Sequence, residues 1–476
     1  MRNFSLLTDL YELTMGQGYF DKGIHEREAA FDLFFRPNEL ISYSVAAGME
    51  EAAQYLENLR FDKEDIAYLS SLRLFSEGFL KYLKNFKFTG TVKAVREGEI
   101  VFPNEPILTV RAPLFEAQIV ETALLNFINH ETLIATKASK IVREAKGDPV
   151  MEFGLRRAQG ADAGVYGARA AIIGGCASTS NVYAGKLFSL SVSGTMAHSW
   201  VMNFAGEKEA FEAYAQTYPD DCVLLVDTYD TLLSGVPNAI EVFLRLREEG
   251  HSPKGIRIDS GDLAYLSKEA RKMLDRAGLQ EVKICASGDL DEYTIRSLKE
   301  QKAKIDSWGV GTKLITSAQL PSLGGVYKLC AVFENGEEIP KLKLSNTEAK
   351  TTDPACKEAY RIYDKETGYA LFDYLARAGE KVDEKAAIAI SGSKKKYEGN
   401  FRLKRLLQPL FVGGKRVKPR YTVDENRKYC EEELARFREE YKRLDMPHIY
   451  KVNLSPALSA LKKELIEKIE EENGSV

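Results

Sequence analysis

The feature that most constrains the fold is an alternation of short apolar runs and helical patterns between residues 148 and 325. The run Cys222–Asp227 (CVLLVD) precedes a helical pattern at Pro237–Glu249, which has proline in its first turn and Gly250 just past its end. The run Gly255–Asp259 (GIRID) precedes a pattern whose apolar residues recur every three or four positions. Runs that are apolar on successive residues, each followed by a helix, indicate a parallel sheet covered on both faces. About seven such units favour closure into an α/β barrel over an open sheet.

The segments on either side of this region have a different pattern. Gly90–Arg111 alternates polar and apolar residues and contains turn residues at Gly98 and Pro103, which is typical of antiparallel strands. Strand-like segments return after residue 325, and the tail beyond residue 424 is a helical pattern of Glu, Lys and Arg. We therefore expect an irregular parallel α/β barrel over residues 116–325, an α+β open-faced sandwich domain built from residues 1–115 and 326–430, and a C-terminal helical extension over residues 431–476.

Composition excludes several classes of protein. The net charge of −4 is small for 476 residues and gives no indication of a nucleic-acid partner. No apolar stretch reaches the roughly 20 residues needed to cross a bilayer, and the first ten residues lack the pattern of a signal peptide. The six cysteines lie far apart without a CxxC pair, which disfavours a disulfide framework or a zinc cluster. We expect a cytoplasmic protein with reduced thiols and no membrane partner.

Polar and charged residues gather where the apolar runs end. The carboxyl ends of all strands in a parallel barrel face one way, so these turns are expected to meet at one mouth. Glycine turns let backbone N–H groups approach phosphate oxygens, carboxylates hold Mg²⁺ with pyrophosphate oxygens, and arginine binds a carboxylate or phosphate through two hydrogen bonds. The set therefore suits a phosphorylated, metal-bound substrate. Its members are Glu152, Arg156, Arg157, Thr195, His198, Asp227, Asp230, Arg257, Asp259, Gly261, Asp262, Ser287, Gly288, Asp289, Gly309, Gly311 and Thr312.

Each of these motifs alone has a plainer explanation. A Ser-Gly-Asp turn is more often only a helix cap, and an arginine beside an aspartate is frequently a structural ion pair. For His198, a structural role and a role as a nucleophile toward phosphorus are both open. The convergence of five such turns on one face is what favours a functional site.

Ten ordered motifs resemble those of the nicotinate phosphoribosyltransferase family. The resemblance runs from Leu6 to about Leu458, and the motif positions show no departure from the family pattern. It implies a type II phosphoribosyltransferase fold, with an irregular α/β barrel beside an open-faced sandwich, in a homodimer with shared active sites. The motifs are LLTDLYELTMGQGYF, FPNEPILTV, EAQIVETALLNFINHETLIATKASKI, EFGLRRAQG, GTMAHSW, DTYDT, GIRIDSGDL, GVGTKL, PSLGGVYKL and YKVNLSPAL.

The resemblance also implies roles for individual residues. Tyr11 would stack on the pyridine ring with Asp9 in support, and Thr195 would contact nicotinate. Arg257 would pair with the nicotinate carboxylate, and His198 matches the phosphorylated histidine of the family. Arg156 or Arg157 would bind the pyrophosphate donor or nicotinate, and Gly311 and Thr312 would bind the ribose 5-phosphate. The remaining candidates are Gly261, Ser287, Gly288 and Asp289 for phosphate, and Asp259 and Asp262 for catalysis through the metal or the ribose hydroxyls.

The implied activity is ATP-dependent formation of nicotinate mononucleotide from nicotinate and 5-phosphoribosyl 1-pyrophosphate, in NAD salvage. ATP would transiently phosphorylate His198, and Mg²⁺, with ligands that the sequence does not identify, would stabilise the leaving pyrophosphate. Nicotinamide phosphoribosyltransferase, which shares the fold, stays open as an alternative. A Mg²⁺-dependent barrel lyase or aldolase is a second one, for which Lys313 is the lysine near the mouth. A non-catalytic binding protein is a third.

Overall fold

The structure is a computed structural model that describes residues 3–345, 350–384, 388–389, 396–397, 400–472 and 474. The chain forms two compact units, one made of Met1–Leu133 and Ser322–Val476 and the other of Ile134–Pro321. We call them the split unit and the central unit, and each is described by itself. The domain boundaries expected from the sequence stay a prediction.

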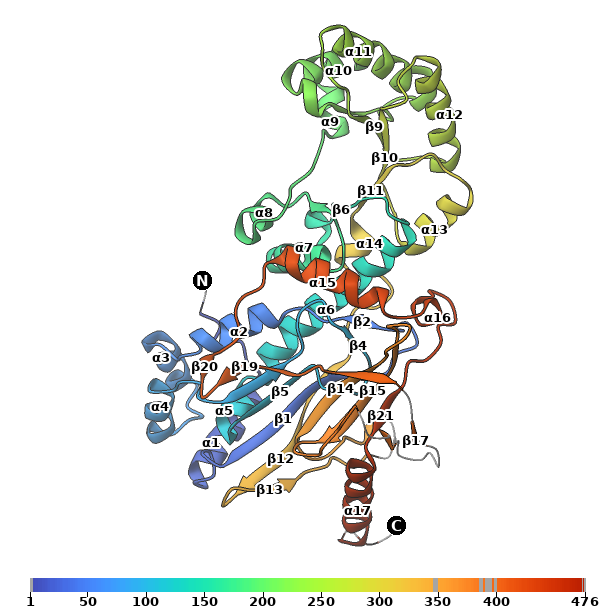
Figure 1. Ribbon diagram of the computed structural model, residues 1–476. Coiled ribbons are helices and arrows are strands. Elements are labelled where there is room, and N and C mark those ends of the chain that lie inside the picture. Colours follow the sequence, from blue (N-terminus) through green and yellow to red (C-terminus); the bar gives the residue numbers. More distant parts are fainter. Residues whose placement is uncertain are drawn as a thin grey trace. The chain divides into compact units, whose positions relative to one another are not determined.

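The central unit is built on a six-stranded sheet in the order β7-β6-β11-β10-β9-β8, in which all neighbouring strands are parallel (Figure 1). Its strands are β6 (Val150–Glu152), β7 (Ser178–Thr179), β8 (Val223–Leu225), β9 (Gly255–Ile258), β10 (Lys283–Ala286) and β11 (Ser307–Val310). Its helices are α7 (Ala161–Ile173), α8 (Val182–Phe188), α9 (His198–Met202), α10 (Glu207–Thr217), α11 (Val236–Glu248), α12 (Leu263–Arg276), α13 (Glu292–Glu300) and α14 (Thr312–Ile315). Short 3-10 turns lie at Leu155–Arg157 and Pro219–Asp221, and a π turn at Thr231–Gly235.

Local sequence explains how these helices begin and which face they bury. Asp262 caps α12 by accepting a hydrogen bond from the backbone N–H of Tyr265 at 3.0 Å. Ala270 and Leu274, which lie four residues apart on that helix, belong to the apolar core that also contains Ile256 of β9. Full burial of one such aliphatic side chain is worth roughly 1.5–3 kcal/mol, so the stripe holds the helix against the sheet.

The split unit contains mainly antiparallel sheets. Its seven-stranded sheet has the order β13-β12-β1-β5-β3-β19-β20, a four-stranded sheet has the order β18-β14-β15-β21, and β2 with β4 and β16 with β17 form short pairs (Figure 1). The strands are β1 (Glu28–Phe35), β2 (Ser44–Val45), β3 (Thr91–Ala94), β4 (Ile100–Val101), β5 (Leu108–Pro113), β12 (Gly325–Glu334), β13 (Glu337–Pro340), β14 (Lys357–Asp364), β15 (Ala370–Arg377), β16 (Ile388–Ala389), β17 (Lys396–Tyr397), β18 (Phe401–Arg405), β19 (Gln408–Val412), β20 (Lys415–Arg416) and β21 (Val452–Leu454).

Helices of the split unit come from both ends of the chain. They are α1 (Leu10–Asp21), α2 (Met49–Asn58), α3 (Lys63–Ser71), α4 (Glu77–Lys84), α5 (Leu114–Ile119), α15 (Val423–Ala435), α16 (Glu439–Lys442) and α17 (Pro456–Glu472), while α6 (Glu121–Glu144) carries the chain into the central unit. Strand β1 pairs with β12 from Ala29 opposite Val332 to Phe35 opposite Gly325. Sequence-distant segments therefore share one sheet, as expected for a unit built from N- and C-terminal parts.

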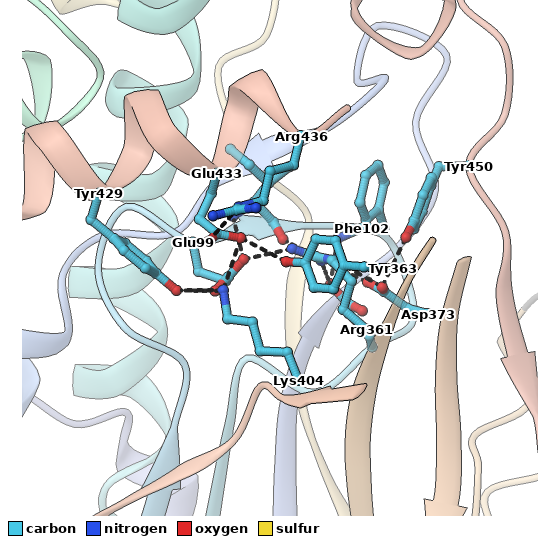
Figure 2. A network of polar contacts seen from close by, with 12 residues as sticks. Glu99, Phe102, Arg361, Tyr363, Asp373, Lys404, Tyr429, Glu433, Arg436 and Tyr450 are labelled. Carbon is cyan, nitrogen blue, oxygen red and sulfur yellow. Dashed lines mark hydrogen bonds and ion pairs between the residues drawn. The ribbon is translucent and has the colours of Figure 1, made fainter. Parts of the chain in front are cut away.

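A buried ionic network joins these segments (Figure 2). At its centre the guanidinium of Arg361 on β14 donates to Asp373 Oδ1 at 2.9 Å and Oδ2 at 2.7 Å, and to Glu99 Oε1 at 2.5 Å. All three side chains are at most 2% exposed. Because unpaired charges are costly away from water, these contacts tie β14, β15 and the residue before β4 together.

The expected α/β class, with a parallel sheet in the middle of the chain and antiparallel sheets from the flanks, is confirmed. Within residues 134–321, all of them described, the sheet ends at β7 and β8 without a pairing between those two strands. Closure of the barrel therefore stays a prediction. The six cysteines are free thiols, as expected. Among the described residues, no helix has both the length and the apolar composition needed to cross a membrane.

Candidate active site

A polar hollow of about 510 Å³ lies at the carboxyl edge of the parallel sheet in the central unit. Five of its lining residues directly follow the last residue of a strand, in the order β6, β7, β9, β10 and β11. The arrangement follows from parallel pairing, which places all these strand ends at one edge. The five are Phe153, Ser180, Asp259, Ser287 and Gly311.

Most of the candidates named from the sequence line this hollow. Those from the strand ends and their turns are Arg156, Arg157, Thr195, Arg257, Asp259, Ser287, Gly288, Asp289, Gly309, Gly311 and Thr312. The structure therefore brings together two arginines after β6, the Thr195 loop, and the turns after β9, β10 and β11. Guanidinium groups, hydroxyls and glycine turns together can bind both phosphate groups and a planar carboxylate.

Arg257 is the most closely held cation of the hollow. Its Nε donates to Ser287 Oγ at 2.8 Å, Nη1 to Thr195 Oγ1 at 3.1 Å and to the Met196 carbonyl at 3.3 Å, and Nη2 to Asp259 Oδ1 at 3.2 Å. The side chain is 14% exposed. Three of its four partners are neutral, so a ligand carboxylate can replace a hydroxyl and gain a charge-assisted pair without removing a buried counter-ion.

His198 is connected to the hollow through Asp227. Its Nε2 lies 3.2 Å from Asp227 Oδ1, and the other oxygen of that carboxylate accepts from the Asp259 N–H at 2.9 Å and from Ser260 Oγ at 2.6 Å. The imidazole is 39% exposed, whereas the Asp227 carboxylate is 2% exposed. A carboxylate at Nε2 selects the tautomer with the proton on that nitrogen and leaves the Nδ1 lone pair for an electrophile. An exposed imidazole in this tautomer can act as a nucleophile, and the role of His198 stays a prediction.

The turn after β10 needs glycine for two reasons. Gly288 has a φ of +106°, a backbone conformation that side chains with a Cβ rarely adopt. A Cβ there would also lie 2.6 Å from the carbonyl oxygen of Asp259. The chain can thus run close to the neighbouring turn and present its backbone N–H groups to the hollow.

Two candidates from the RIDSGD turn lie outside the lining of the hollow. Gly261 supplies a φ of +80° to the turn, and the Asp262 carboxylate caps α12. The cap is the plainer of the two roles considered for a Ser-Gly-Asp turn. A direct metal or ribose contact of Asp262 stays a prediction.

Tyr11 and Asp9 belong to the split unit. Tyr11 lies in the first turn of α1 and is 44% exposed, and Asp9 is the N-cap residue of that helix. Its Oδ2 accepts a hydrogen bond from Thr122 Oγ1 at 3.2 Å. The two residues therefore lie close together at the N-terminus of α1. Their expected contacts with nicotinate stay predictions.

Sequence reasoning missed several members of the hollow. Phe153, Ser180 and Met196 line it and were not among the candidates. Asp227 was one of the strand-end candidates, and the structure adds that its carboxylate contacts His198. Phe153 had no signal in the sequence, since an aromatic residue after a strand is usually part of a core.

The split unit has a second hollow, of about 400 Å³, with excess positive charge. Lys357 and Asp32 form a buried ion pair at 2.7 Å in its wall, and Lys462 pairs with Asp353 at 2.7 Å. Arg36 and Lys350 also line it, and no described residue pairs with either of them. Two cations beyond the balanced pairs suit an anion such as phosphate. The sequence analysis did not single out this hollow.

The part of the chain that the structure describes offers one cluster of carboxylates with metal-ligand spacing. Glu51, Glu97 and Glu131, all buried in the split unit, have oxygens within 4.8 Å of one another. Glu97 also accepts hydrogen bonds from the Gly48 N–H and the Asn426 amide. The carboxylates that face the hollow of the central unit are Asp259 and Asp289. Few protein ligands are what Mg²⁺ requires when substrate oxygens complete its shell, so this pair fits that ion.

Lys313, the lysine weighed for a lyase, pairs with Asp291 Oδ2 at 3.0 Å. It does not line the hollow of the central unit. A Schiff-base lysine requires a neutral amine close to the substrate. The geometry therefore disfavours the lyase.

Comparison with known proteins gives consistent matches along the chain. Residues 6–129, 149–361 and 356–462 match the N-terminal domain, the family model and the C-terminal domain of nicotinate phosphoribosyltransferase. The nicotinate phosphoribosyltransferase of Bacillus subtilis is 46% identical over 486 residues, covering 99% of this chain and 98% of that protein. The Caenorhabditis elegans protein of the same name is 34% identical over 520 residues, with 95% and 92% covered.

A solved structure agrees with these matches. The crystal structure of human nicotinic acid phosphoribosyltransferase superposes with a TM-score of 0.85 at 31% identity, covering 96% of this chain and 99% of the human one. Sequence and fold thus match over nearly the whole length. The chain belongs to the nicotinate phosphoribosyltransferase family.

Proposed function

We propose that this protein converts nicotinate, 5-phosphoribosyl 1-pyrophosphate, ATP and water into nicotinate mononucleotide, pyrophosphate, ADP and phosphate. The observation that carries the proposal is the connected series His198–Asp227–Asp259–Arg257 at the edge of the polar hollow. It joins a group suited to accept phosphate to a group suited to bind an acid. The printed names of the relatives support nicotinate as that acid.

Arg257 is the proposed anchor of the nicotinate carboxylate. The acid would take the place of the Thr195 hydroxyl and the Met196 carbonyl at Nη1, while Ser287 and Asp259 keep the guanidinium in its plane. Held in this way, the ring nitrogen attacks the anomeric carbon of the ribose as pyrophosphate leaves. Fixed orientation of the two reactants supplies much of the rate enhancement in such a displacement.

Charge changes at both ends of the reacting bond. The sugar gains positive charge in the transition state, and the Asp259 carboxylate, 30% exposed at the hollow, is placed to stabilise it. The leaving pyrophosphate gains negative charge, which Arg156, Arg157 and the backbone of the Gly288 turn are suited to bind. Asp259 and Asp289 would hold Mg²⁺, which neutralises pyrophosphate oxygens when bound.

His198 is the proposed acceptor of the γ-phosphoryl group of ATP. Nδ1 forms the bond to phosphorus as the bond to ADP breaks, and the Nε2 proton stays on the Asp227 carboxylate side. A phosphoryl group adds roughly −1.5 to −2 charge beside a site of arginines and carboxylates. This charge is large enough to rearrange the loops that carry those residues. Hydrolysis of the phosphohistidine then releases phosphate and drives the reaction toward nucleotide.

The decisive experiment incubates the purified protein with nicotinate, 5-phosphoribosyl 1-pyrophosphate and Mg²⁺, with and without ATP. We expect nucleotide and pyrophosphate in both cases and more of each with ATP. Competition between nicotinate and nicotinamide at equal concentration tests the alternative substrate. A preference for nicotinamide would overturn the role of Arg257, which has no anion to pair with in the amide.

The phosphohistidine is tested separately. Incubation with ATP alone should add one phosphoryl group to the peptide that carries His198. The variant Asp227→Asn should lower that incorporation, because the tautomer is no longer selected. Phosphate found on another residue would contradict the assignment.

The remaining expectations are proposals of the same kind. We infer a cytoplasmic enzyme of NAD salvage that works as a homodimer with active sites drawing on both subunits. Sedimentation of the purified chain tests the dimer. Mixing an Arg257→Ala chain with a Tyr11→Ala chain tests sharing, because mixed dimers should recover activity if each site uses both chains.

A further inference from the structure

The Asp227 carboxylate lies between His198 and the turn that follows β9. Its Oδ1 is 3.2 Å from His198 Nε2, and its Oδ2 accepts hydrogen bonds from the Asp259 N–H at 2.9 Å and from Ser260 Oγ at 2.6 Å. Each oxygen therefore contacts a different part of the site. Because a carboxylate is a rigid, planar group, a movement of one oxygen also moves the other.

Burial makes this carboxylate depend on both sets of partners. The Asp227 side chain is 2% exposed, whereas the His198 imidazole is 39% exposed and Ser260 lies at the surface. A buried charge is costly when it loses hydrogen-bond partners, because water does not replace them. We therefore expect Asp227 to keep its partners when His198 changes, and to move the turn after β9 with it.

The turn after β9 is also joined to the groups proposed to bind the substrates. The Asp259 carboxylate accepts hydrogen bonds from Arg257 Nη2 at 3.2 Å and from the Ser287 hydroxyl. The Asp259 carbonyl oxygen lies so close to Gly288 that a Cβ there would be 2.6 Å away. Chains of hydrogen bonds and packed groups of this kind carry coupling between sites. A shift of Asp259 therefore reaches both the proposed nicotinate anchor and the proposed phosphate turn.

Phosphorylation of His198 would change the contact at Asp227 Oδ1. The Nδ1 lone pair forms the bond to phosphorus, ADP leaves with the electrons of the bond that breaks, and the proton stays on Nε2. The ring then carries a positive charge, so its contact with Asp227 becomes a charge-assisted hydrogen bond, which is shorter and roughly twice as strong as a neutral one. A separation of 3.2 Å leaves room for that shortening.

The plainer role of a Ser-Gly-Asp turn, a helix cap, does not account for the Ser260 hydroxyl. Asp262 caps α12, because its carboxylate accepts a hydrogen bond from the Tyr265 N–H at 3.0 Å. The Ser260 hydroxyl donates instead to Asp227, which follows the neighbouring strand β8. Ser260 thus links two strand ends of the sheet.

We infer that Ser260 is the positioning residue that transmits phosphorylation of His198 to the groups that bind the substrates. Its hydroxyl, together with the Asp259 N–H, couples the turn after β9 to Asp227. Ser260 is not among the residues that line the hollow of the central unit, so it acts on the substrates through its neighbours. The inference rests on the proposed function, in which ATP phosphorylates His198. It makes Ser260 necessary for stimulation by ATP but not for the reaction without ATP.

Rates of nucleotide formation with and without ATP test the inference in the full-length enzyme. In Ser260→Ala, the rate without ATP should stay close to that of the wild type. His198 should still be phosphorylated, because Asp227 keeps its contact with the ring. The ratio of the rates with and without ATP should fall by about 3- to 10-fold, the effect of losing one hydrogen bond from the link. Less nucleotide should then be made for each ATP hydrolysed.

Two further variants separate this role from a structural one. Ser260→Thr keeps the hydroxyl and should restore the stimulation by ATP. Ser297→Ala is the matched control, because Ser297 is an exposed serine of the same unit whose hydroxyl accepts a hydrogen bond from Gln301 at 3.1 Å. It should change neither rate. A Ser260→Ala variant in which both rates fall together, or in which His198 is no longer phosphorylated, would overturn the inference.

The wild type measured alongside separates the inference from the proposed function. A wild type that makes no nucleotide, or that ATP neither phosphorylates nor stimulates, would reject the proposed function and the inference with it. A wild type that ATP stimulates, beside a Ser260→Ala variant that ATP stimulates equally, would reject the inference alone.

Discussion

Arg257 in the hollow of the central unit and Arg361 in the core of the split unit each hold carboxylates, yet their surroundings give them different roles. Arg257 is 14% exposed and has one carboxylate, two hydroxyls and a carbonyl as partners. Arg361 is fully buried, and its partners are the carboxylates of Glu99 and Asp373 and one carbonyl (Figure 2). Both guanidinium groups donate several hydrogen bonds, so the number of hydrogen bonds does not distinguish the binding role from the structural role.

What separates them is whether a partner can be replaced. A hydroxyl on Arg257 can give way to a ligand acid, because it leaves no unpaired charge behind. A carboxylate on Arg361 cannot be exchanged, because it is buried and would remain charged without its counter-ion. Arginines with neutral partners at a hollow therefore indicate binding, and arginines with charged partners in a core indicate stability.

The largest effect that tests this comparison is expected from Arg361→Met. The variant keeps an apolar stem of similar length but leaves Asp373 buried without its cation and Glu99 with Lys404 as its remaining cation. We expect a loss of about 3–5 kcal/mol in the free energy of unfolding, measured with denaturant. Arg257→Met is the matched control and should lose much less. Equal losses of stability in the two variants would contradict the distinction between a structural and a binding arginine.

Arg257→Lys should give the next largest effect, on binding rather than on stability. Lysine keeps the charge but loses the planar fork that holds two oxygens at once. We expect KM for nicotinate to rise by about 10- to 100-fold, corresponding to one or two charge-assisted hydrogen bonds. Steady-state kinetics measure the change in KM, and a denaturation curve on the same preparation measures any change in stability. A fall in stability with unchanged KM would contradict the proposed role.

Local sequence patterns explain why part of the site could be predicted. Asp259, Ser287 and Gly311 directly follow strands whose apolar runs and helix caps are visible in the sequence. Parallel pairing then brings them together without further information. Asp262 shows the limit of this reasoning, because its position in the same turn makes it a helix cap rather than part of the hollow.

Contacts between distant segments could not be predicted. His198 and Asp227 are 29 residues apart, and Arg361 and Glu99 are 262 residues apart. Arg361 lies on a strand whose sequence, KEAYRIYD, suggests that its charged residues face water, and yet the structure buries it. Periodicity reports which side of a strand a residue occupies, but not that both sides are covered.

Glu105 allows the ionic network to be tested by pH. Its side chain is 1% exposed, and burial together with the neighbouring Asp373 carboxylate raises its pKa well above the usual 4.5. The folded protein therefore keeps a proton that the unfolded chain releases above about pH 4.5. This favours folding at low pH, and stability falls as pH rises toward the folded pKa.

Glu105→Gln removes that proton exchange while keeping the shape of the side chain. Relative to the variant, the wild type should lose up to ~1.4 kcal/mol for each pH unit above about 5, until the pH passes the folded pKa. Unfolding curves at several pH values measure the difference. A wild type that gains stability relative to Glu105→Gln as pH rises would contradict the assigned direction.

Lys404 lies at the edge of the network and should give the smallest effect. Its ammonium is 2.7 Å from Glu99 Oε2, 2.7 Å from the Tyr429 hydroxyl and 2.8 Å from Glu433 Oε2, and its side chain is 25% exposed. Lys404→Met removes the charge, but Glu99 keeps Arg361 and the Tyr429 hydroxyl as partners.

The loss in Lys404→Met should therefore be about 1 kcal/mol or less, close to that of a partly exposed ion pair. Salt should reduce it, because water reaches this side of the network. If Lys404→Met instead cost as much as Arg361→Met, the charges would act as one inseparable unit. The burial of one side chain would then not determine how much that side chain contributes to the free energy of unfolding. Whether a partner can be replaced would have to be judged for the whole network of charges rather than for one arginine.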